Sequence, residues 1–296
     1  MVNTNRPIVT VGLCLKNVEK TIKEAVSSIV DQDFPHEQME IIFVDDGSED
    51  NTLKIILDYA SKIDIKTKVF HTEWRGLGPA RHTVVDNANG DFILWVDGDT
   101  MLSKDYVKQQ VNFMMQHPSV GIASGIFGVL PEDNWTATLE NVGYVISRMR
   151  QKGKPTTSLL STSGSIFRVD AIRQAGGFDC NIKGAQEDID VAYRIKQDGW
   201  LFYVTSAVFY HRQRRTWKAL WRQHFWYGYG LHFILHKNKG QSALLDRSVD
   251  RIPLSFFAYK LTHRKVVFLM PLNFVFKKTA LLFGFSKGHI DGYGHE

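Results

Sequence analysis

The chain has 296 residues and a formal net charge of +5 at neutral pH. This length can bury a large core, so we expect one large domain, or one domain with an appended segment. The length also excludes a small disulfide scaffold. The two cysteines, Cys14 and Cys180, lie far apart and lack metal-ligand spacing, which favours a reducing compartment. The N-terminus lacks a basic stretch followed by an apolar one, so we expect no signal peptide and a cytoplasmic catalytic part.

Short apolar runs alternate with helical patterns over the first hundred residues. Residues 8–15, 39–44 and 93–96 predict buried strands, and residues 69–70 a shorter one. Between them, apolar residues recur at three- and four-residue spacing over 22–30 and 53–60, which predicts helices. This alternation favours an α/β fold with a Rossmann-like, mostly parallel sheet, whose functional edge lies at the carboxyl ends of the strands.

The pattern changes in the second half of the chain. Residues 163–168 predict a strand, 169–175 a short helix and 176–179 a tight turn. Acidic residues open a helix that continues over 191–197, and strands at 201–204 and 207–210 complete the sheet. We expect irregular or partly helical connections over 27–38 and 133–155.

Acidic residues follow the predicted strands. Asp45 and Asp46 come after the second strand, and Asp97 and Asp99 after the fourth. The single glycine between Asp97 and Asp99 lets both carboxylates point toward one hard cation, Mg²⁺ or Mn²⁺. The same residues are also typical of an ordinary turn, so this motif does not decide the function by itself.

Taken in order, the motifs of this chain resemble those of the inverting family 2 glycosyltransferases, which have the GT-A fold. The matching segments are Asp45-Asp46-Gly47-Ser48, Gly76 with Ala80-Arg81, Asp97-Gly98-Asp99, Gly164-Ser165 with Gly176-Gly177-Phe178-Asp179, and Glu187-Asp188-Ile189-Asp190. Each match is weak alone, but the ordered set spans roughly residues 8–215. The resemblance implies a GT-A nucleotide-diphospho-sugar transferase fold that transfers a sugar, with inversion, from a nucleotide-diphosphate sugar to an acceptor hydroxyl.

The resemblance also implies contacts to the donor. Asp45 and Asp46 can accept hydrogen bonds from the base and the ribose hydroxyls, and a helix-capping turn is the alternative. Arg81 can pair with base or diphosphate through its planar guanidinium, although a surface ion pair would explain this residue equally well. Gly164 and Ser165 are expected to line the substrate site.

The same resemblance assigns a metal and a base. Asp97 and Asp99 are expected to hold Mg²⁺ or Mn²⁺ against the departing diphosphate, Asp97 also contacting substrate. His211, after the last strand, is expected to complete the metal shell or contact a phosphate, and a structural role is its alternative. Asp188 is expected to take the proton of the acceptor hydroxyl, with Glu187 contacting substrate. Acids that stabilise a helix start are the alternative.

Some positions depart from the family pattern. Residues 213–217 do not match the Gln-x-x-Arg-Trp element of processive synthases, so we expect no processive polymerisation. Trp74 and His82 stand where many relatives carry Asn, which weakens the donor contacts expected there.

Residues 216–296 are expected to form a helical C-terminal extension to a catalytic domain at 1–215. Residues 211–296 contain 15 Lys and Arg but only 4 Asp and Glu. Residues 1–210 contain 21 Lys and Arg and 27 Asp and Glu. Aromatic residues alternate with these basic ones, as at a membrane interface, and charges interrupt 252–285, so we expect no membrane-spanning run. Peripheral contact with the inner face of the cell membrane is expected, with a packed helical cap as the alternative. The acidic strand edge does not suit nucleic acid.

We therefore expect a glycosyltransferase for cell-surface glycan, polysaccharide or glycolipid synthesis, acting on a glycan or lipid-linked acceptor. The alternatives are a nucleotidyltransferase and a non-catalytic nucleotide-sugar-binding protein. Nucleotidyltransferases usually carry a Gly-rich basic loop after the first strand, and residues 12–17 are a poor version of it. A binding protein without activity would be expected to lose the acids at 187–190, which this chain keeps.

Overall fold

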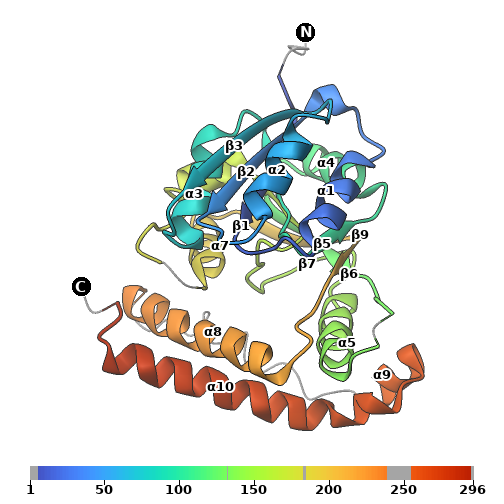
Figure 1. The fold of residues 1–296 in the computed structure, drawn as a ribbon, viewed down its shortest axis with the longest axis vertical. Coiled ribbons are helices and arrows are strands. Elements are labelled where there is room, and N and C mark those ends of the chain that lie inside the picture. Colours follow the sequence, from blue (N-terminus) through green and yellow to red (C-terminus); the bar gives the residue numbers. More distant parts are fainter. Residues whose placement is uncertain (1–5, 132, 183–184, 239–254, 295–296) are drawn as a thin grey trace.

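The structure is a computed structural model and describes residues 6–131, 133–182, 185–238 and 255–294. A nine-stranded sheet with helices on both faces forms the larger part, and long C-terminal helices lie along one end of it (Figure 1). The strand order is β3-β2-β1-β4-β8-β6-β9-β5, and β7 pairs with β9.

The first half of the chain forms the parallel part of the sheet. Strands β3, β2, β1 and β4 pair in parallel, as the alternating pattern predicts. The third strand is longer than predicted, and Gly78 and Pro79 in the first turn of α3 obscure that helix in the sequence. In chain order the elements are β1 (Val9–Leu15), α1 (Ile22–Val30), η1 (His36–Gln38), β2 (Met39–Asp46), α2 (Thr52–Ala60), β3 (Lys66–Thr72), α3 (Leu77–Asn87) and β4 (Phe92–Trp95).

Beyond β4 the sheet is mixed. Strand β8 (Ser165–Arg168) runs antiparallel to both β4 and β6 (Val120–Phe127), and β9 (Leu201–His211) is parallel to β6. Strand β5 (Thr100–Leu102) and the short β7 (Lys154–Pro155) run antiparallel to β9. The two strands predicted at 201–204 and 207–210 are one strand, because a register shift opposite Gly125 accommodates the residues between them.

Four further helices cover this half: α4 (Tyr106–Gln116), α5 (Trp135–Met149), α6 (Val169–Gln174) and α7 (Glu187–Gln197). The connection at 133–155 is thus more regular than expected. Its helix α5 is capped by Asn134, whose side chain accepts a hydrogen bond from the Ala137 amide, and it buries Leu139, Val142 and Val145.

The sheet separates two hydrophobic cores because successive strand residues point to opposite faces. On β2, Ile41 and Phe43 belong to one core, and Ile42 and Val44 to the other. Helices α1, α2 and α4 cover the first face, and α3, α6 and α7 cover the second. The strands thus end between two packed layers, and the acidic residues follow directly after them.

The described C-terminal elements are α8 (Trp217–Lys237), α9 (Ser255–Thr262), η4 (Lys265–Leu269) and α10 (Met270–Ile290). Helices α8 and α10 lie side by side along their length (Figure 1). A Cβ at Gly228 would lie 1.9 Å from the Leu281 carbonyl oxygen, and one at Gly284 would lie 1.8 Å from that of Phe225. Only glycine permits so close an approach of the two backbones.

A buried carboxylate joins this helix pair to α5. Glu140 of α5 is 2% exposed, and its Oε1 accepts hydrogen bonds from Asn273 Nδ2 and Lys277 Nζ, each at 2.8 Å. His224 Nε2 of α8 is 3.8 Å from the other oxygen, beyond hydrogen-bonding distance, and burial lowers the pKa of His224. Burial alone would raise the pKa of Glu140, but interactions with His224 and Lys277 outweigh it and lower the pKa to about 2.

Within the described residues, Lys265–Ile290 is the one helical segment long and apolar enough to cross a bilayer by length and composition, with a mean hydropathy of 1.6 over an 18-residue stretch. The prediction that no run reaches this length is therefore wrong. Lys277 and Lys278 interrupt the apolar sequence without ending the helix. Part of the predicted tail, residues 239–254, lies outside the described residues.

Candidate active site

Three candidate metal ligands meet beside the ends of β4 and β9. Asp97 and Asp99 lie in the turn between β4 and β5, and His211 is the last residue of β9. The pairing of Thr100 with His211 places that imidazole beside the turn, with His211 Nε2 3.1 Å from Asp99 Oδ1. One ligand atom from each of the three residues lies within 4.8 Å of the others, a spacing that fits a single cation.

The charges in this cluster support one another. Burial would raise the pKa of Asp99, but the charge and hydrogen bond of His211, with Arg214, outweigh burial and lower it. Burial would lower the pKa of His211, but Asp99 and Asp97 outweigh burial and raise it. Arg214 Nη1 lies 3.4 Å from Asp99 Oδ2. Asp99 and His211 therefore stabilise each other's charged form, and Arg214 lies beside Asp99.

Arg81 connects this cluster to the start of α7. It is 6% exposed, its Nη1 donates to Glu187 Oε1, and its Nη2 lies 3.5 Å from Asp97 Oδ1. The guanidinium also lies 6.0 Å from the ring centroids of Trp95 and Phe178. These contacts suit a group that positions the two acids, and direct contact of Arg81 or Glu187 with substrate stays a prediction.

Of the acids that open α7, Asp188 is placed differently from its neighbours. Glu187 is buried against Arg81, and Asp190 is buried against Arg194 and Lys237, whose nitrogens lie 2.7 and 2.9 Å away. Asp188 is only partly buried. It is thus the acid of this group that is accessible to a substrate, as a base must be.

Helix α8 supplies a wall beside Asp188 that the sequence did not reveal. Tyr227 accepts a hydrogen bond from Gln186 at its carbonyl, 3.2 Å, and from Gln223 at its hydroxyl, 3.0 Å. Burial raises the pKa of Tyr227, and the charges of Tyr144 and Asp188 raise it further. The aromatic spacing of 217–233 indicated a helix, but nothing local to it indicated which of its residues lies near the start of α7.

The acids after β2 have different surroundings. Asp46 accepts hydrogen bonds from the amides of Arg75 and Gly76, at 2.7 and 2.9 Å, and so fixes the loop before α3. Asp45 is fully buried, its Oδ2 lies 2.8 Å from His71 Nδ1, and its Oδ1 has no hydrogen-bond partner among the described residues. An unsatisfied buried acceptor at the end of a strand suits recognition of a ligand N–H or O–H.

Two further residues lie beside these acids. Lys16 Nζ donates to the Gly47 carbonyl at 3.1 Å and lies 5.4 Å from the centre of the Trp74 ring. Trp74 is 58% exposed. An exposed aromatic ring next to a buried acid is a surface on which a nucleobase can stack. The sequence indicated Trp74 only as a departure from the family pattern.

Gly164 and Ser165 do not open onto the acid cluster. Ser165 is fully buried and donates to the Ser161 carbonyl at 2.6 Å, while the Gly164 carbonyl accepts from the Tyr106 hydroxyl. A Cβ at Gly164, where φ is +59°, would lie 2.6 Å from the Phe209 ring. These contacts give both residues a structural role, and substrate contact stays a prediction.

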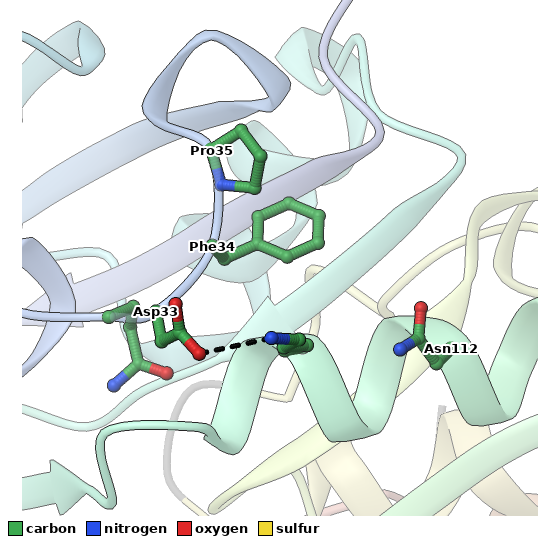
Figure 2. A pocket seen from close by; sticks show the side chains of 6 residues that line it. Asp33, Phe34, Pro35 and Asn112 are labelled. Atoms are coloured by element: carbon green, nitrogen blue, oxygen red, sulfur yellow. Dashed lines mark hydrogen bonds and ion pairs between the residues drawn. The ribbon is translucent and has the colours of Figure 1, made fainter.

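A surface hollow also lies between the loop after α1 and helix α4 (Figure 2). The Asp33–Lys108 ion pair, with 3.0 Å between Oδ2 and Nζ, closes one side of it (Figure 2). None of the acids, histidines or arginines discussed above lines this hollow. The candidate site is therefore the acidic strand edge.

Comparisons with known proteins find a matching family and several relatives. The model of the family described as glycosyl transferase family 2 matches residues 10–176, more than half of the chain. Poly(ribitol-phosphate) beta-N-acetylglucosaminyltransferase TarS of Staphylococcus aureus is 32% identical over 159 residues, covering 51% of this chain and 28% of TarS. Probable glycosyltransferase YdaM of Bacillus subtilis is 26% identical over 263 residues, covering 86% and 62%. The chain thus spans less than two thirds of these relatives.

Solved structures show the fold. Mannosyltransferase PcManGT from Pyrobaculum calidifontis, in complex with GDP-Man and Mn²⁺, has a TM-score of 0.67 and 19% identity, covering 97% of this chain and 88% of that one. Residues 1–349 of Staphylococcus aureus TarS, in complex with UDP-GlcNAc, have a TM-score of 0.53 and 18% sequence identity. This match covers 97% of this chain and 91% of that one. The predicted GT-A fold is confirmed.

Proposed function

The chain belongs to glycosyl transferase family 2, and from this premise we propose that it transfers a sugar from a nucleoside-diphosphate sugar to an acceptor hydroxyl, with inversion. Residues 1–215 would carry the catalysis, and 216–296 would be an attached extension. The observation that carries this proposal is the link from Asp97 through Arg81 and Glu187 to the start of α7, where Asp188 is accessible. This link holds a cation site and a base in fixed relation, as inverting transfer requires.

Asp97, Asp99 and His211 would hold the divalent cation. Two carboxylates and an imidazole within 4.8 Å of one another form a donor set that suits Mn²⁺ and accepts Mg²⁺. When bound, the ion supplies positive charge against the diphosphate leaving group. The Mn²⁺ in the PcManGT complex supports this proposal.

The chain's own side chains would do the remaining work. Asp188 would accept the proton of the acceptor hydroxyl while that oxygen attacks the anomeric carbon. Asp45 would accept a hydrogen bond from the nucleotide, and Trp74 would stack on its base, since the ring is exposed beside that acid. Tyr227 would line the acceptor side, because its hydroxyl end belongs to the wall beside Asp188.

We also propose that α10 lies flat on the inner face of the membrane, where a lipid-linked acceptor would be presented. Leu272 and Phe283 are 66% and 60% exposed, and with Val275 and Leu282 they form an apolar surface turned away from α8. The opposite side of α10 is bonded to Glu140 through Asn273 and Lys277. A spanning orientation would break these buried contacts, whereas a flat one keeps them.

The first experiment measures the melting temperature of the full chain with UDP-GlcNAc, GDP-mannose and other nucleotide sugars, with and without Mn²⁺. We expect one donor to raise the melting temperature only when Mn²⁺ is present. At a hundredfold excess over its Kd, the bound donor should increase the free energy of unfolding by about 2.7 kcal/mol. With a suitable acceptor, the reaction of that donor should release nucleoside diphosphate. The glycosylated product should have the inverted anomeric configuration.

The nucleotidyltransferase alternative predicts a different product. A nucleoside triphosphate and a sugar phosphate would then yield pyrophosphate. Pyrophosphate release, together with no melting shift by any nucleotide sugar, would refute the proposed transfer reaction.

A further inference from the structure

Three histidines meet far from the acidic strand edge, between α8 and α10. His232 and His236 lie one turn apart on α8, and His289 lies in the last turn of α10. One ring nitrogen from each lies within 4.8 Å of the others. His232 is fully buried, while His236 and His289 are exposed. The group is therefore anchored on its inner side and open to water on its outer side.

Hydrogen bonds set the tautomer of two of these rings. His232 Nδ1 lies 2.8 Å from the Tyr293 carbonyl oxygen, and His236 Nδ1 lies 3.0 Å from the His232 carbonyl oxygen. A carbonyl oxygen only accepts, so each Nδ1 carries the proton and each Nε2 carries a lone pair. A backbone carbonyl that fixes the outer nitrogen is the usual support of a metal-binding histidine.

The spacing of one nitrogen pair fits tetrahedral coordination. His232 Nε2 lies 3.3 Å from His289 Nδ1. Zn–N bonds of about 2.0–2.1 Å place two ligand nitrogens of a tetrahedron about 3.3–3.4 Å apart. Two histidines four residues apart on a helix can also reach one ion from the same face.

We propose that His232, His236 and His289 form a binding site for a divalent transition-metal ion, with Zn²⁺ as the first candidate. Neutral imidazole suits Zn²⁺, Cu²⁺ and Ni²⁺, whereas Mg²⁺ prefers oxygen ligands, so this site differs in chemistry from the acid cluster. With three protein ligands, the fourth position takes a water molecule.

The bound ion would fasten the end of α10 to α8. Lys237, the residue after His236 on α8, donates hydrogen bonds to Asp179 at 2.6 Å and to Asp190 of α7 at 3.0 Å. The ion would therefore stiffen the junction between the C-terminal helices and the helix that carries Asp188. None of the three ligands belongs to the acid cluster, so the role that we assign to the ion is structural.

The test titrates metal-stripped full chain with ZnCl₂ by calorimetry, in a background carrying Asp97→Asn and Asp99→Asn to remove the acid site. Titration with Co²⁺, read by the visible absorption that marks tetrahedral coordination, reports the geometry. His236→Ala and His289→Ala change exposed ligands, so the fold is kept. His117→Ala is the control, because His117 is also exposed and bonded to the carbonyl four residues before it, at 2.8 Å.

We expect one Zn²⁺ per chain, a rise in melting temperature, and a loss of affinity of at least about tenfold in each ligand variant but not in His117→Ala. Two results would overturn the proposal: no saturable Zn²⁺ binding in this background, or binding that both ligand variants retain unchanged. Either would leave the contact between His232 and His289 as a hydrogen bond without metal.

Discussion

The buried carboxylate of Glu140 gives a quantitative prediction about how the C-terminal helices are held. Glu140→Gln keeps the side-chain volume and an acceptor for Asn273, but it removes the negative charge opposite Lys277. A pKa lowered from 4.5 to about 2 corresponds to about 3 kcal/mol of stabilisation at pH 7. Lys277 is 25% exposed and partly solvated, so we expect Glu140→Gln to lower the free energy of unfolding by about 2 kcal/mol.

The sign of the pH dependence follows from the direction of the shift. Because the pKa of Glu140 is lower in the folded protein, its contribution is complete above the unfolded value of 4.5 and is lost as the pH falls toward about 2. The difference in free energy of unfolding between the wild type and Glu140→Gln should therefore shrink to less than half its neutral value by about pH 3.

The assay is urea unfolding followed by tryptophan fluorescence, since Trp217 and Trp221 of α8 contact Phe276 of α10. Glu37→Gln, at an exposed acid on η1, is the control and should change stability little. A double-mutant cycle with Lys277→Met isolates the pair. An equal difference at neutral and acidic pH would show that the charge of Glu140 is not what holds α10.

The remaining predictions concern the site and the membrane surface. Asp99→Asn should abolish turnover while the protein stays folded, since an amide is a poor ligand for a hard cation, and full activity in EDTA would contradict this. Asp188→Asn should lower kcat by roughly 10²-fold or more at nearly unchanged donor affinity, and a collapse of donor binding would instead make Asp188 a binding residue. Leu272→Asp combined with Phe283→Asp should reduce sedimentation with anionic liposomes, and high salt should release the wild type only partly; unchanged sedimentation would mean that α10 is not the membrane surface.

The local sequence determined the parallel half of the sheet. Strands β1, β2 and β4 are buried on both faces, so each appears as a largely apolar run, with the buried Thr10 and Glu40 as exceptions. The runs of β2 and β4 stop at acidic residues. Asp97 and Asp99 could be predicted as a pair because one glycine separates them in the chain. Helix α5 was expected only as a partly helical connection.

Contacts between distant segments were decided by the tertiary structure. His211 joins the acid cluster because β5 pairs with β9, which is a matter of register and not of local composition. The same holds for Arg81 with Glu187 and for His232 with His289, whose partners lie 106 and 57 residues away. Local periodicity specifies which face of an element is buried, but only the packing of complete elements specifies which side chains meet.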